Sequence, residues 1–159
     1  MPCRCCAPEI QALFERQGVL TPVELESRYE VYMEQYILAI EVEARLALRM
    51  ARTQIYPAAM EYLERIAHSL EAQAVIQADP DRSIALALSG LNQQLVRHAS
   101  ALEAALANPP QGTHAHLRHC SDSLLPLMAD IRAAVDGLEA LVDEELWPLP
   151  TYQELLFVR

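Results

Sequence analysis

The chain has 159 residues, of which 52% are hydrophobic and only 4 are glycine. This composition is typical of one soluble domain with a sizeable core, and it excludes a disordered chain, a collagen-like repeat and a small disulfide-stapled scaffold. Twelve basic residues oppose 22 acidic ones, which gives a formal charge of −10. A field of this sign repels phosphate backbones and anionic lipid, so we expect neither nucleic acid nor a membrane as a partner.

The cysteines and the start of the sequence predict a cytoplasmic protein. Three of the four cysteines, Cys3, Cys5 and Cys6, crowd into the start of the chain, and the fourth is Cys120. This is not the spacing of a disulfide framework, and reduced thiols fit the cytosol. The first residues lack the apolar stretch of a signal peptide, and the apolar runs are far shorter than the roughly 18 residues of a membrane span.

Apolar side chains recur three and four residues apart, a spacing that predicts helices throughout. Residues 7–20 predict a short helix that ends at Gly18. The first long helix begins at Thr21, because a threonine followed by Pro22 and Glu24 forms a capping box. Its apolar face comprises Leu25, Tyr29, Tyr32, Tyr36, Ile40, Ala44, Ala47, Ala51 and Ile55, broadened by Met33, Ile37, Leu46 and Met50. A helix with so wide an apolar arc is predicted to pack on more than one side.

Prolines mark the interruptions of these helices. Pro57 lacks an N–H and clashes with the preceding turn, so we predict a kink or break near Tyr56 and a continuation to about Gln77. A second long helix begins after the sequence at positions 79–81, Asp-Pro-Asp, and ends before Asn108. Its apolar stripe comprises Ile84, Leu88, Leu91, Leu95, Ala99, Leu102 and Leu106. A last helix is predicted over 114–146, from about His114 to Leu146, with a bend at Pro126.

These segments predict an all-α fold, namely an up-and-down antiparallel helical bundle with a long kinked first helix. We divide the chain into an N-terminal tail and short helix over residues 1–20, the bundle over residues 21–146, and an extended C-terminal tail over residues 147–159. The tail begins with Trp-Pro-Leu-Pro, which favours extended backbone, and Thr151 with Glu154 is predicted to cap one short turn.

No metal centre is predicted from the histidines and cysteines. A di-iron bundle needs Glu-x-x-His motifs on paired helices, and none of the five histidines has a glutamate three residues before it. Glu64 and His68 are interpreted as a surface pair. A zinc site would need a fourth ligand and supporting hydrogen-bond partners, which the densest group of ligand types does not provide, so we interpret that group as a polar helix entrance. This His/Cys cluster comprises His114, His116, His119 and Cys120.

No catalytic site is predicted either. The four glycines are scattered, so the chain has no phosphate-binding loop, and it has no nucleophile-elbow or zinc-protease motif. Three pairs four residues apart are interpreted as solvated helix faces. They are Glu24/Arg28, Glu41/Arg45 and Glu61/Arg65. The tyrosine ridge, which comprises Tyr29, Tyr32 and Tyr36, is interpreted as core or helix packing rather than as a binding groove.

Two segments resemble a known enzyme family. The first runs from Glu24 to Tyr36 as Glu-Leu-Glu-Ser-Arg-Tyr-Glu-Val-Tyr-Met-Glu-Gln-Tyr and continues through residues 40–45 and 53–59. The second is the tail from Leu146 to Tyr152, Leu-Trp-Pro-Leu-Pro-Thr-Tyr, followed by Glu-Leu-Leu-Phe. Both resemble the C-terminal region of type III glutamine synthetases. The resemblance spans about residues 8–159 and thins to helical pattern between positions 67 and 118.

The resemblance implies a place in a ligase of nitrogen metabolism that joins ammonia to glutamate with ATP and divalent metal, assembled as a ring-based oligomer. The family's nucleotide, glutamate and metal sites lie upstream, so it carries no catalytic, cofactor-binding or metal residue onto this chain. We expect a non-catalytic domain that holds no cofactor and supports the fold and oligomer assembly of the parent enzyme. Its expected partners are the upstream catalytic domain and neighbouring subunits, and when isolated it is expected to form a weak homodimer through an uncovered apolar face.

The alternative is a stand-alone helical binding or regulatory protein that uses the tyrosine ridge or the His/Cys cluster as its site. The residues are compatible with a segment of a longer enzyme and with a shortened gene product expressed alone.

Overall fold

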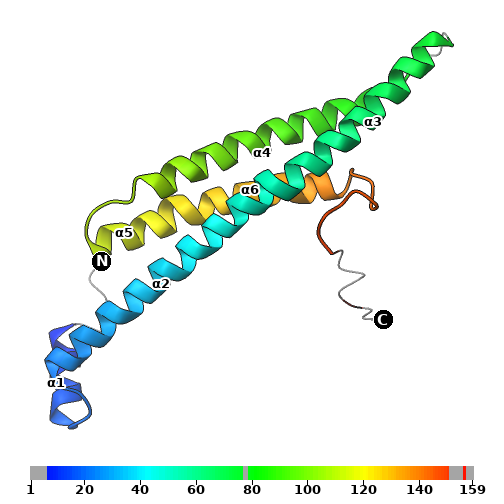
Figure 1. The fold of residues 1–159 in the computed structure, drawn as a ribbon. Helices are drawn as coiled ribbons and strands as arrows, with labels where there is room; N and C mark the ends of the chain where they lie inside the picture. The colour runs from blue at the N-terminus through cyan, green and yellow to red at the C-terminus, as the bar shows by residue number, and fades with distance from the viewer. Residues whose placement is uncertain (1–6, 77–78, 151–155, 157–159) are drawn as a thin grey trace.

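Figure 1 shows a computed structural model of the chain, which describes residues 7–76, 79–150 and 156. Every regular element in these ranges is helical, so the predicted all-α class is confirmed. Three long segments lie side by side with alternating direction, as predicted for an up-and-down bundle (Figure 1). The cysteines near the start, the end of the first long helix at Gln77 and the turn predicted from Thr151 and Glu154 fall outside the described residues.

The N-terminal elements form as their capping residues predict. Helix α1 (Pro8–Arg16) is followed by Gly18, whose φ of 63° lies in the left-handed region that glycine adopts without strain. Helix α2 (Pro22–Met50) begins with the predicted capping box. The Glu24 N–H donates to Thr21 Oγ1 at 3.3 Å, and the Thr21 N–H donates to Glu24 Oε2 at 2.8 Å. These donors from Thr21 lower the pKa of the Glu24 carboxyl.

Two π-helical turns carry the long helices past their prolines. The first, η2 (Ala51–Ile55), joins α2 to α3 (Tyr56–Val75), and Pro57 is the second residue of α3. The Tyr56 N–H donates to the carbonyl of Ala51, five residues back instead of four. The hydrogen-bonding pattern of the helix has therefore shifted by one residue just before Pro57, which has no N–H to donate. The irregularity predicted near Tyr56 is therefore this π turn, and the helix continues through it instead of breaking.

The third long segment repeats this arrangement and ends earlier than predicted. Helix α5 (Thr113–His119) continues through η3 (Cys120–Leu124) into α6 (Leu125–Glu139), with Pro126 just past the π turn. The predicted end at Leu146 is wrong. From residue 140 the chain folds into turns in which Asp143 accepts hydrogen bonds through its side chain and its carbonyl. Aspartate favours such turns over continued helix, and the turns bring Trp147 back onto the bundle.

Leucines of α4 (Ser83–Ala107) form the centre of the core. Leu88, Leu95 and Leu102 are completely or almost completely buried, and α4 packs against both α3 and α6. The predicted stripe is confirmed at these positions, whereas Ile84, in the first turn of α4, is about half exposed. Arg52 also ties η2 to α4, since its two terminal nitrogens each lie 2.6 Å from a carboxylate oxygen of Glu103.

Asn92 is the buried polar residue of the part of the chain that the structure describes. Its Nδ2 lies 3.6 Å from the sulfur of Met60 on α3, and its Oδ1 has no hydrogen-bond partner. A buried acceptor that has lost water without gaining a donor costs free energy.

We therefore predict that Asn92→Leu raises the free energy of unfolding by about 1–3 kcal/mol, because it replaces an unsatisfied amide by an apolar side chain of similar size. Urea denaturation followed by circular dichroism measures the change. The matched control is Gln93→Leu, at the adjacent exposed position, which we expect to have little effect. A lower stability of Asn92→Leu would contradict the prediction.

Candidate interaction surfaces

The His/Cys cluster predicted from sequence does not converge on one point. His116 Nε2 lies 2.9 Å from Glu41 Oε1 on α2, while His119 Nε2 lies 3.0 Å from the carbonyl oxygen of Ala105 on α4. The two imidazoles thus join α5 to different helices. Among the described residues, no group of three or more His, Cys, Asp and Glu side chains is arranged to hold a metal ion.

Glu41 contacts two side chains, one on its own helix and one on α5, a role that sequence reasoning missed. One of its carboxylate oxygens contacts His116, and the other lies 3.2 Å from Arg45 Nη2. The Glu41 side chain is only 19% exposed, so its interpretation as part of a solvated face is wrong. Glu41 and His116 are 75 positions apart, and no local pattern could have paired them.

Cys120 is a core residue. Its side chain is completely buried within η3, and burial raises the pKa of its thiol, with the charge of Glu41 adding to the effect. A thiol that is both inaccessible and protonated is a poor nucleophile and a poor metal ligand.

The tyrosine ridge is mostly outside the core. Tyr32 and Tyr36 are 66% and 43% exposed, so the predicted packing of these two residues is wrong. The core-facing side of α2 instead contains Met33 and Ile37, each of which directly follows one of these tyrosines in the chain. Tyr29 is half-buried, and its ring lies against that of His114 with centroids 6.1 Å apart.

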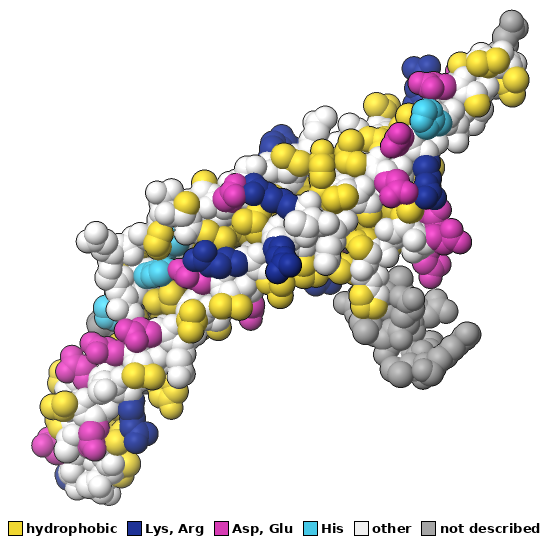
Figure 2. All heavy atoms as spheres, in the orientation of Figure 1, with side chains coloured by type: hydrophobic (Ala, Val, Ile, Leu, Met, Phe, Trp, Pro, Cys, Tyr) yellow, Lys and Arg dark blue, Asp and Glu magenta, His cyan; other side chains and the backbone are white. Residues whose placement is uncertain are grey.

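A second apolar stripe of α2 faces away from the bundle. It consists of Val31, Leu38, Val42 and Leu46, which are 47–62% exposed, and we call it the outer stripe. With successive residues about 100° apart, the four fall within an arc of about 80° on the side opposite the buried residues of α2. Helix α2 thus has two apolar faces. One lies in the core, and the other is exposed in the described part of the chain (Figure 2).

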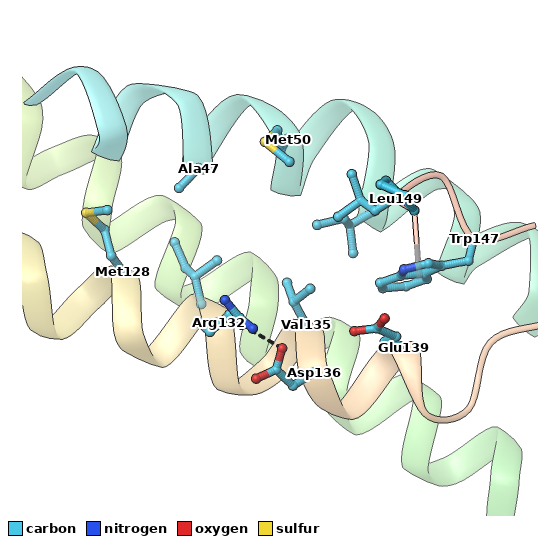
Figure 3. Close-up of a pocket in the computed structure, with 12 residues that line it drawn as sticks. Ala47, Met50, Met128, Arg132, Val135, Asp136, Glu139, Trp147 and Leu149 are labelled. Carbon is cyan, nitrogen blue, oxygen red and sulfur yellow. Dashed lines mark hydrogen bonds and ion pairs between the residues drawn. The ribbon is translucent and has the colours of Figure 1, made fainter. Parts of the chain in front are cut away.

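A groove of about 400 Å³ lies where the C-terminal segment meets the bundle (Figure 3). Met50 of α2 and Val135 of α6 line it, and Trp147 and Leu149 close one end. Trp147 is 9% exposed and belongs to the core cluster, so this segment is anchored by the indole ring. The polar rim is provided by α6, where Arg132 Nε lies 2.7 Å from Asp136 Oδ1.

Comparison with known proteins finds one family model and several relatives that match this chain. The family model of the glutamine synthetase C-terminal domain matches residues 4–74. Over 159 aligned residues the chain is 30% identical to the type-3 glutamine synthetase of Dictyostelium discoideum, an alignment that covers 92% of this chain and 21% of that protein. This chain is similar to the C-terminal region of type III glutamine synthetases. The resemblance found in the sequence is thereby confirmed.

Two bacterial glutamine synthetases agree with this relationship. The chain is 26% identical to the protein of Bacteroides fragilis, with 94% of this chain and 22% of that protein aligned. It is also 26% identical to the protein of Butyrivibrio fibrisolvens, with 91% and 22% aligned. The chain spans about a fifth of the length of these synthetases.

The outer stripe lies in the part of the chain that matches the synthetase C-terminal domain model, which includes α1, α2 and almost all of α3. None of the helices within the described residues has the length and apolar character that a membrane span requires.

The environment of Cys120 yields a labelling prediction. In the folded protein, iodoacetamide should modify Cys120 far more slowly than in the urea-unfolded protein, because the thiol is buried and its pKa is raised. Peptide mass spectrometry separates Cys120 from the other three cysteines. Equal labelling rates in the folded and unfolded states would contradict burial in η3.

The anchoring of the C-terminal segment yields a stability prediction. Trp147→Ala should lower the free energy of unfolding by about 3 kcal/mol, the low end of the range for deletion of a buried indole, since the residue packs at the end of the core. Circular dichroism during urea unfolding measures the loss. Trp147→Phe keeps an aromatic ring in place, so it should lower the free energy of unfolding much less. A decrease as large as that of the alanine variant would argue against packing as the cause.

Proposed function

We propose that this chain is the non-catalytic C-terminal helical domain of a type III glutamine synthetase, and that it supports the fold and oligomer assembly of the parent enzyme. The family match supports the first part. The observation that carries the second part is the outer stripe, a row of large apolar side chains in the matched region without a cover in the described chain. An exposed apolar surface of this kind is typical of an interface.

Burial of this surface would contribute favourable free energy to assembly. Complete burial of a valine or leucine side chain is worth about 1.5–3 kcal/mol, and these four side chains are roughly half exposed, so covering them would contribute on the order of 3–6 kcal/mol before ordering costs. We infer that the outer stripe is covered in the assembled enzyme, by the upstream catalytic region or by a neighbouring subunit.

The cofactors of the proposed parent enzyme, ATP and divalent metal, belong in this proposal to the upstream catalytic domain. Among the described residues no three or more His, Cys, Asp and Glu side chains are grouped to hold a metal ion, and His116 and His119 instead contact Glu41 and the carbonyl oxygen of Ala105. We therefore assign this chain a supporting role and no chemical step.

The test introduces a charge into the outer stripe of the full-length enzyme. Leu38→Glu and Val42→Glu should each shift the enzyme to smaller assemblies in light scattering after gel filtration, and should lower the specific activity with it, because a buried unpaired carboxylate is costly. Leu86→Glu changes a leucine of α4 that is 71% exposed, and this matched control should leave assembly unchanged. Normal ring size and activity in both stripe variants would contradict the proposal.

The exposure of Tyr32 and Tyr36 favours a second candidate, a stand-alone helical binding or regulatory protein that uses the tyrosine ridge. An antibody against this domain distinguishes the two candidates in lysate of the source cells. A band several-fold heavier than 17.8 kDa supports the synthetase, and a band at 17.8 kDa supports the stand-alone protein.

A further inference from the structure

We propose that the outer stripe of α2 pairs antiparallel with the outer stripe of a second copy of this chain, about a twofold axis between Leu38 and Val42. This inference rests on the proposed role in assembly and names the partner of the same surface. It follows from the order of apolar and charged side chains along α2.

The apolar residues suit a twofold contact. Leu38 and Val42 lie near the middle of the stripe. An antiparallel arrangement places Leu38 of each copy against Val42 of the other. Val31 and Leu46 extend the contact on either side. At about 1.5 Å per residue the stripe is about 22 Å long, which is roughly four helical turns.

Two charges on one flank of the stripe are placed as an antiparallel pair requires. Glu34 lies beside the N-terminal half of the stripe, and Arg45 lies beside its C-terminal half. Antiparallel pairing therefore sets acidic against basic ends twice. Parallel pairing would place these two charges on opposite sides of the contact and at different heights, so Glu34 would not reach Arg45 of the second copy.

The position of these charges around the helix also favours antiparallel pairing. Glu34 and Arg45 are eleven positions apart, so at about 100° per residue they lie on one side of the stripe within about 20° of each other. In an antiparallel pair with a twofold axis, the same flank of each helix meets the same flank of the other. Glu34 then lies beside Arg45 of the second copy. Arg45 is 60% exposed and uses one nitrogen on Glu41, which leaves further donors for this contact.

The size of the surface predicts weak association of the isolated chain. A contact of about four turns between two helices is smaller than the roughly 800 Å² per partner of a stable interface. In an oligomer that already holds the subunits together, effective concentration would make the same contact persistent.

Charge reversal tests the pairing in the 159-residue chain by sedimentation velocity over a concentration series. The wild-type chain should dimerise reversibly, and Glu34→Arg and Arg45→Glu should each weaken the dimer about tenfold or more, because each sets like charges opposite each other. The double variant should regain near wild-type association. An equimolar mixture of the two single variants should form a heterodimer, since each then supplies the charge that the other lacks.

The controls separate this inference from the proposed function. Glu64→Arg makes the same charge change on α3, where the side chain is 73% exposed, and should leave dimerisation unchanged. Circular dichroism verifies that each variant is folded. A wild-type chain that stays monomeric at millimolar concentration, or a dimer without charge-reversal rescue, would overturn the antiparallel pairing. If the full-length Val42→Glu enzyme nevertheless failed to assemble, the proposed function would stand with a different partner for the stripe.

Discussion

The packing of α4 between the first long segment and α6 is the constraint on which the rest of the molecule depends. Leu88, Leu95 and Leu102 stand at helical spacing on one face and lose practically all exposure to water, and this burial is the main source of free energy that holds the helices together. The first segment is held on one side and α6 on the other, so both must stay helical past their prolines to keep contact with α4. The π turns η2 and η3 make this continuity compatible with Pro57 and Pro126.

This arrangement also explains why an apolar surface is left outside. Helix α2 is apolar over more of its circumference than one neighbouring interface can cover, and the bundle takes up the arc through Met33, Ile37 and Ile40. The opposite arc carries the outer stripe. The contact between Glu41 and His116 agrees with this orientation, because it joins the side of α2 to α5. The exposure of the outer stripe, on which the proposed assembly role rests, is thus a consequence of how the core selects one of two apolar faces.

A supporting role fits the chemistry of the chain as well as its shape. Several of its polar side chains make contacts between helices, such as Arg52 with Glu103 and His119 with the carbonyl oxygen of Ala105. Such contacts position helices, whereas a catalytic site needs titratable groups that converge on a free space. The groove beside Trp147 has an apolar lining and an internally paired Arg132 and Asp136 at its rim, so it anchors the C-terminal segment without presenting a reactive group.

The sequence by itself determined the helices, their starts and the resemblance to the C-terminal region of type III glutamine synthetases. Thr21 with Glu24 caps α2, Gly18 ends the segment before it, and the α4 stripe identifies the core face, because these signals act over a few residues. Only the tertiary structure decided that Tyr32 and Tyr36 are exposed, that the His/Cys cluster is divided between two helices, and that the chain turns after Glu139. The physical reason is that periodicity shows which faces of a helix are apolar, whereas the neighbour that covers each face is chosen by contacts between residues far apart in the chain.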